Sequence, residues 1–250
     1  EYFPKLNRIE SYYTYKFIDK NCTSMVVDII NKTLDTVAIV KKADTDITYR
    51  AILYPYFDGH FYEKLGTSII FGTKVDQLGT QVFLPFELLK SLKKVSFQNH
   101  PLVQETKTTI EFKNEVPFSW WNNPYTYIML FSFIVFINKK SINLLYISIM
   151  AIIGLFFSFV GFYSSHLELG YNYNIALFNP TLLGMLYFYW TKNKKGIYNL
   201  AVFNIVLLVI YFFFIINKAH LVLVLPLVAT SGIILVRLAI QNKQRIPIII

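Results

Sequence analysis

The chain has 250 residues, of which 54% are hydrophobic and 18% aromatic, and its formal net charge is +9 at pH 7. This apolar content excludes an ordinary soluble protein and favours a membrane protein. Residues 1–116 hold 15 basic and 14 acidic residues, whereas the remainder holds nine basic residues and a single acid, Glu168. The basic surplus therefore lies in the hydrophobic part, which argues against nucleic-acid binding and for a membrane partner.

Residues 1–116 have the size of one domain and mix helical with strand-like patterns, which predicts an α+β fold. The elements that we expect are helices over 23–34, 48–57 and after Pro85, a strand at 36–42 and an edge strand at 106–116. The sequence begins with Glu1 and shows no signal sequence, although an exported N-terminal domain requires one. We therefore expect residues upstream of Glu1 to be missing from the sequence.

Cys22 is the only cysteine of the chain and lies at the start of the helix expected over 23–34. Asn21 or Thr23 can cap this helix. Unpaired amides and the helix dipole favour an anion at a helix N-terminus, so they stabilise a thiolate there. Two interpretations remain open, a nucleophile and a small buried core residue, because free cysteine is often buried.

Residues 117–250 contain five stretches that are long and apolar enough to cross a bilayer core of roughly 30 Å. These stretches are 118–138, 141–163, 172–190, 197–217 and 219–236. The connections on one side carry every basic residue of this part except Lys218, which lies on the other side. The positive-inside rule then predicts a multi-pass, all-α bundle with a cytoplasmic C-terminus and residues 1–116 outside.

A catalytic thiol usually works with a histidine within hydrogen-bond reach. The histidines of the chain are His60, His100, His166 and His220. His166 differs from the others because it shares a short outer loop with Glu168, the only acid of the membrane part. The alternative for this pair is an interfacial histidine beside a solvated glutamate.

Asn172, Asn174 and Asn179 with Pro180 lie in or beside the third expected span. Amides are costly in hydrocarbon unless they find partners, so they indicate either a polar cavity at the outer leaflet or a device for helix packing. The sequence shows neither the spacing of zinc ligands nor a Gly-rich phosphate loop, so we expect no metal and no cofactor.

Five separate stretches, taken in order, resemble one family. They are YYTYKFIDKNCTSMVVDII, TYRAIL, LGTSIIFGTKVD, FLPFELL and SSHLELGYNYNIALFNP. Their order and spacing resemble the Lnb-type lipoprotein N-acyltransferases of Gram-negative bacteria. The resemblance implies a periplasmic thiol domain of papain-like or lecithin:retinol acyltransferase-like fold, followed by transmembrane helices in the bacterial inner membrane.

The resemblance further implies an enzyme that moves an acyl chain from a phospholipid to the α-amino group of the diacylglyceryl-cysteine of an apolipoprotein. Cys22, beside Asn21, matches the nucleophile that forms a thioester. His166, Asn172 and Asn174 match a membrane-proximal motif of the family. Three residues, Tyr49, Arg50 and Asp76, also fall on family landmarks, and the resemblance assigns them no role.

One departure from the family concerns the general base. The family carries a Gly-His motif upstream of the cysteine, whereas no histidine precedes Cys22 here. Either this histidine lies upstream of Glu1, which we favour, or His166 is the base. Two other functions stay open: a thiol hydrolase or peptidase of the cell envelope, and a non-enzymatic membrane scaffold or transporter accessory protein.

Overall fold

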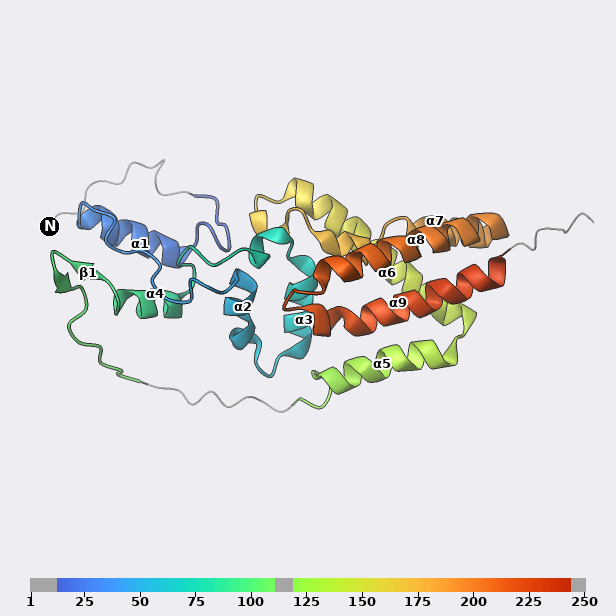
Figure 1. The fold of residues 1–250 in the computed structure, drawn as a ribbon, viewed down its shortest axis with the longest axis horizontal. Coiled ribbons are helices and arrows are strands. Elements are labelled where there is room, and N and C mark those ends of the chain that lie inside the picture. The colour runs from blue at the N-terminus through green and yellow to red at the C-terminus, as the bar shows by residue number, and fades with distance from the viewer. Residues whose placement is uncertain (1–12, 111–118, 244–250) are drawn as a thin grey trace, which may run out of the picture.

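A computed structural model describes residues 13–110 and 119–243. Helices α1 and α4 lie at one end of the molecule and α5 to α9 form a bundle at the other, with α2 and α3 between them (Figure 1). The elements in chain order are α1 (Cys22–Thr33), α2 (Tyr49–Leu53), η1 (Tyr54–Phe57), α3 (Phe61–Ile70), η2 (Thr73–Asp76), α4 (Pro85–Leu92), β1 (Ser96–Phe97), β2 (His100–Pro101), α5 (Pro124–Ile137), α6 (Lys140–Tyr163), η3 (Leu167–Leu169), η4 (Tyr173–Ala176), α7 (Leu182–Trp190), α8 (Lys194–Ile215) and α9 (Leu221–Asn242).

Three helices of the bundle, α6, α8 and α9, are long and apolar enough to cross a membrane. The prediction of five spans is wrong, because α5 has 14 residues and α7 has nine. At a rise of 1.5 Å per residue they extend about 21 and 14 Å, well short of a hydrocarbon core of roughly 30 Å. The chain is therefore a membrane protein with three candidate spans among its described residues.

Helix α7 is short because the polar residues before it take up their hydrogen bonds locally. The Asn172 side chain caps the 3-10 turn η4 by accepting from the backbone amide of Asn174. The Asn179 side chain accepts from the amide of Thr181, and Pro180 between them has no amide to donate. A continuous helix over 172–190 is thereby replaced by two short elements.

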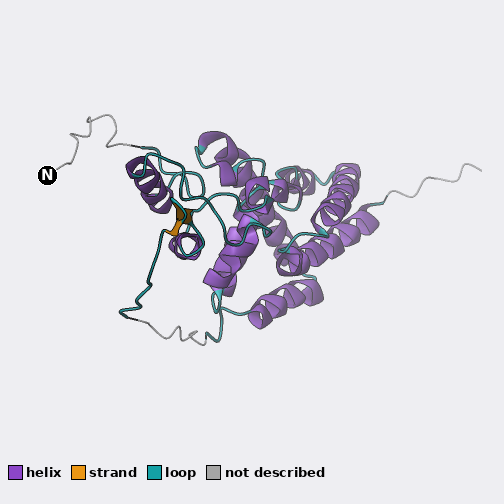
Figure 2. Cartoon of the chain, turned by 60° about the vertical axis from the view of Figure 1, so that its left-hand side comes forward, coloured by secondary structure: helices purple, strands orange, loops and turns teal. Residues whose placement is uncertain are grey.

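The prediction of an α+β domain is also wrong, since 63% of the residues that the structure describes are helical. Within the described residues the only sheet is the hairpin of β1 and β2, whose turn residues Gln98 and Asn99 have positive φ (Figure 2). Residues 36–42 form no strand, because the Asn31 side chain bonds both the amide and the carbonyl of Ile39. Residues 106–110 form no strand either, and 111–116 lie outside the described residues.

The helices expected at the start of the chain are confirmed, with α1, α2 with η1, and α4 within a residue or two of the predicted bounds. A small core lies beneath them, formed by Ile18, Tyr49, Ile52, Leu53, Val75 and Phe83. Helix α3, which was not predicted, instead packs on the bundle: Leu65 belongs to the bundle core and α3 contacts α9. The two ends of the molecule are thus joined through α3.

Two glycines mark places where backbones approach closely. A Cβ on Gly72 would lie 2.1 Å from the carbonyl oxygen of Gly170, where the chain after α3 passes the loop after α6. A Cβ on Gly154, in α6, would lie 1.8 Å from the carbonyl oxygen of Phe178. Both contacts fix the segment 164–181 against its neighbours.

Substitution of Gly154 by alanine is expected to destabilise the protein, because the added methyl group overlaps a backbone carbonyl. Overpacking of this kind costs about 1–3 kcal/mol. Gly66→Ala in α3 is the matched control, since no atom lies within 4 Å of the added Cβ. Thermal unfolding in detergent measures both, and equal melting temperatures would contradict this packing.

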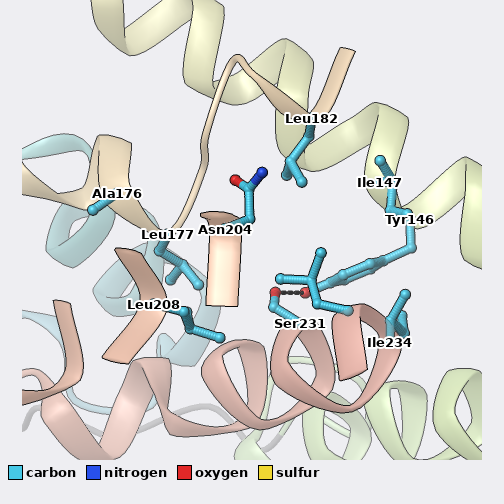
Figure 3. Close-up of a pocket in the computed structure, with 10 residues that line it drawn as sticks. Tyr146, Ile147, Ala176, Leu177, Leu182, Asn204, Leu208, Ser231 and Ile234 are labelled. Atoms are coloured by element: carbon cyan, nitrogen blue, oxygen red, sulfur yellow. Dashed lines mark hydrogen bonds between the residues drawn. The ribbon is translucent and has the colours of Figure 1, made fainter. Parts of the chain in front are cut away.

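A small cavity lies inside the bundle and is lined by residues of α6, α8 and α9 and by the segment before α7 (Figure 3). Its volume is about 10 Å³, enough for a single water molecule at most. The Tyr146 hydroxyl and Ser231 Oγ bond to each other at 2.6 Å beside it. These polar groups therefore serve helix packing and leave no room for a lipid.

Candidate functional site

Asn21 fixes the position of Cys22 at the start of α1. Its side chain is 3% exposed, and its Oδ1 accepts from the amide of Ser24, which caps the helix. Its Nδ2 donates to the carbonyls of Phe17 and Phe83, at 2.7 and 2.8 Å. Cys22 itself is exposed, so it is not a core residue. Its thiol is accessible at the positive end of the helix dipole.

His166 and Glu168 form a hydrogen-bonded pair in the loop after α6. His166 Nδ1 lies 3.1 Å from Glu168 Oε1, and the imidazole is one-third exposed. Glu168 is 1% exposed, so the alternative of a solvated glutamate is wrong. A carboxylate at Nδ1 holds the proton there and leaves Nε2 free to act as a base.

The segment before Cys22 lies against this pair. The backbone amide of Phe17 donates to Glu168 Oε1 at 3.2 Å, and the ring of Tyr15 packs on His166 with centroids 6.3 Å apart. Burial raises the pKa of the Tyr15 phenol, and the neighbouring charges of Cys22, Tyr13 and Glu168 raise it further.

The geometry thus places an imidazole and a buried carboxylate against residues 15–17, in the segment that leads to Cys22. No hydrogen bond joins the Cys22 thiol to another described residue, and the hydrogen bonds of catalytic groups are often long in enzymes without substrate. No group of three or more His, Cys, Asp or Glu side chains that could hold a metal ion occurs in 13–110 or 119–243. The chemistry that these groups can perform is nucleophilic attack by sulfur with acid–base assistance.

Arg50 and Asp76 lie in a separate buried ionic cluster, between α2 and the bundle. Arg50 Nε donates to Asp76 Oδ1 at 2.7 Å, and Nη1 donates to the carbonyl of Ser68 at 3.0 Å. The other carboxylate oxygen of Asp76 accepts from the Tyr173 hydroxyl and, at 3.1 Å, from Lys218 Nζ. The cluster joins four elements and is structural in character.

The two predicted asparagines of the membrane-proximal motif also make structural contacts. Asn172 Nδ2 donates to the carbonyls of Ile69 and Ile70, which end α3. Asn174 donates to the carbonyl of Ile69 and accepts from the Tyr211 hydroxyl at 2.7 Å. They thus bind the C-terminus of α3 to the bundle.

Tyr49 is likewise held by the fold. Its hydroxyl accepts from the amides of Thr80 and Gln81, at 3.2 and 3.1 Å, and its ring meets Phe83 edge-on. Tyr49 therefore supports the loop that leads to Phe83, the residue whose carbonyl anchors Asn21.

Arg50→Met is expected to lower the free energy of unfolding by about 3–5 kcal/mol, because it leaves the Asp76 carboxylate buried without its main partner. The matched control is Lys90→Met, which breaks the exposed ion pair with Asp44 and should cost less than about 1 kcal/mol. Chemical unfolding in detergent followed by tryptophan fluorescence measures both losses. A loss of unfolding free energy for Arg50→Met no larger than that for the control would contradict the stabilising role of the cluster.

Acid should weaken the same cluster. Burial alone would raise the pKa of Asp76, but the charge of Arg50 and the hydrogen bonds from Arg50, Tyr173 and Lys218 hold it below its usual range. The contribution of Asp76 is therefore complete above its unfolded pKa of about 3.9 and is lost as the pH falls through the lower folded value. We expect the difference in Tm between wild type and Asp76→Asn to be constant above about pH 5 and to shrink below about pH 4.

Sequence reasoning missed several residues of these two sites. Glu168 could have been chosen with His166, because it is the only acid after residue 116. No local sequence pattern marked the other contributors as site residues, which are Tyr15, Tyr173, Lys218 and the backbone of Phe17. Three comparisons with known proteins found no matching protein-family model, no matching curated protein and no matching solved structure.

Proposed function

We propose that this chain is a membrane-bound thiol acyltransferase that carries an acyl chain from a phospholipid to the α-amino group of a lipid-modified N-terminal cysteine, the reaction of the family that the sequence resembles. One observation carries the proposal: Glu168 Oε1 contacts both His166 Nδ1 and the amide of Phe17, five residues before Cys22. The imidazole, its carboxylate and the thiol-bearing segment are thus held together next to membrane helices.

In the first half-reaction His166 Nε2 removes the proton from the Cys22 thiol. The thiolate attacks the carbonyl carbon of the phospholipid ester, and the first-turn amides of α1 stabilise the oxyanion. The carbon–oxygen bond then breaks, and the departing lysophospholipid oxygen takes the proton from His166. The products are a Cys22 thioester and a lysophospholipid.

In the second half-reaction the amine of the acceptor attacks the thioester. His166 accepts a proton from the amine as the new carbon–nitrogen bond forms, and the carbon–sulfur bond breaks. The proton returns to the sulfur, which restores the starting enzyme. Glu168 stabilises the imidazolium in both steps, and its burial strengthens that interaction.

The polarity of the bundle supports a thiol site on one side of the membrane. Glu168, after α6, bonds the amide of Phe17, and Lys218, after α8, bonds Asp76 in η2, so the C-terminal ends of α6 and α8 face residues 17 and 76. The lysines that begin α6 and α8 lie at the opposite ends of those helices. This polarity agrees with a bacterial inner-membrane enzyme whose thiol site faces the periplasm.

The test is the identity of the product. Purified full chain, reconstituted with phosphatidylethanolamine and a synthetic diacylglyceryl-cysteine peptide, should yield a peptide with one additional amide-linked acyl chain by mass spectrometry. Lysophospholipid should accumulate in equal amount. Release of free fatty acid or cleavage of the peptide without a new amide would identify a thiol hydrolase or peptidase instead, and no reaction at all would favour a scaffold.

A further inference from the structure

A groove runs along the end of α6 that faces the thiol segment. Its volume is about 550 Å³, within the range of roughly 300–1,000 Å³ that small ligands occupy. One wall is the last two turns of α6, and the other is the segment before and within η4. The groove is lined by Phe157, Ser158, Gly161, Phe162, Gly170, Tyr171, Asn172, Tyr173 and Ile175.

The surface of this groove is mainly apolar, because the polar side chains of Ser158, Asn172 and Tyr173 already have partners elsewhere. Ser158 Oγ donates to the carbonyl of Gly154 within α6. Asn172 donates to α3, and the Tyr173 hydroxyl donates to Asp76. The surface that a ligand would meet therefore consists of aromatic rings, aliphatic carbon and the open backbone at Gly161.

Two exposed aromatic side chains stand at the rim. Phe162 is 94% exposed and Tyr171 is 90% exposed, both next to the end of a candidate membrane span. Tyr171 also has a φ of 49°, a conformation that a non-glycine residue rarely adopts. Such strain persists only where the surroundings hold it, and it often accompanies ligand sites.

The two walls of the groove are joined by residues 164–169, and these residues carry His166 and Glu168. We propose that the groove binds one acyl chain of the phospholipid donor and thereby presents its ester to His166 and Cys22, an inference that rests on the proposed function. A hydrocarbon chain fits because the groove is apolar, opens beside a membrane helix and leads to the loop with the acid–base pair.

The test is photolabelling with a phosphatidylethanolamine that carries a diazirine in its acyl chain, in nanodiscs of phosphatidylethanolamine and phosphatidylglycerol. It is done on the Cys22→Ser variant, so that binding is measured without turnover. Labelling of residues 170–175, mapped by mass spectrometry, should exceed labelling of the exposed face of α8 at Ile210 and Phe213. Equal labelling of the two surfaces would overturn the proposal.

Gly161→Leu fills the groove. A Cβ at Gly161 meets its nearest atom, the carbonyl oxygen of Leu169, at 3.7 Å, so the fold accommodates the substitution. Labelling of 170–175 should fall roughly tenfold, as expected when hydrocarbon groups compete for one apolar pocket. Gly66→Leu, at a helical glycine with open space around it, is the matched control and should leave labelling unchanged.

Tyr171→Gly is a second variant that removes a rim side chain while it relieves the backbone, because glycine adopts a positive φ freely. Labelling should fall without a fall in Tm; unchanged labelling in both groove variants would refute the site. Labelling confined to the groove without a Cys22-dependent amide would keep the groove and reject the acyltransferase. Formation of a Cys22-dependent amide together with unselective labelling would support the acyltransferase and reject the groove.

Discussion

Cys22→Ser is expected to form no N-acylated peptide, while it inserts into membranes and melts like wild type. A serine hydroxyl at this position lacks the thiolate character on which attack depends. Stability should be unchanged because the side chain is exposed and bonds to no described residue. Mass spectrometry of the peptide product and thermal unfolding in detergent measure the two effects.

Alkylation provides an independent check of the same prediction. Cys22 is the only cysteine in the sequence, so iodoacetamide modifies a single thiol and the intact mass reports its extent. Alkylation should abolish transfer in step with modification, and prior acylation by phospholipid should protect the thiol. Transfer that survives full alkylation would exclude the thioester.

His166→Ala is expected to lower the rate of transfer by roughly 10²–10⁴-fold, the usual contribution of a positioned acid–base group. Glu168→Gln should also slow transfer, because an amide cannot stabilise the imidazolium as a buried carboxylate does. His100→Ala, in the exposed hairpin, is the control and should retain the wild-type rate. Initial rates of amide formation across pH measure all three.

The pH dependence of the transfer rate distinguishes a catalytic role of His166 from a structural one. If His166 is the acid–base group, the pH–rate profile of wild type has a limb that the profile of His166→Ala lacks. A variant that melts earlier but keeps that limb would give His166 a structural role only. The base would then have to lie elsewhere, as the family's upstream histidine suggests.

The local signals of the sequence were sufficient for the helix that carries Cys22. An asparagine followed by apolar residues at helical spacing predicts both the cap and the helix, and Asn21 indeed caps α1 with Ser24. Proline at the first turn located α4 in the same way. Such features depend on a few consecutive residues, so a single sequence contains them.

Hydropathy was a poorer guide to the spans, because it measures composition and not where the backbone helix breaks. The first stretch was expected to begin at residue 118, whereas α5 begins only at Pro124, after its N-cap Asn123. In the third stretch the apolar residues around Asn174 and Asn179 raise the average, although these asparagines bond to the backbone of α3 or close local turns. The hydrogen-bond partners of these asparagines, which hydropathy does not register, therefore determined where the helix breaks.

The ionic cluster and the Glu168 contacts could not be found in this way. Phe17 and Glu168 are 151 positions apart, and Tyr173 and Asp76 are 97 positions apart. No period or motif in one sequence encodes a pair at such a separation. The residues themselves were singled out at Arg50, Asp76 and Asn172, but their role as a joint between α3 and the bundle required the fold.

The contacts between α3 and the bundle also set the order in which parts of the chain can fold during synthesis. The ion pair between Asp76 and Lys218 cannot form until Lys218, 142 positions further along, has been synthesised. The apolar face of α3 is likewise covered only once α9 is present. A nascent chain folds from its N-terminus as it is made, and contacts this distant form late. Cys22 is therefore synthesised early, but the segment before it can bond Glu168 only after α6 has been made, so unfinished chains lack that contact.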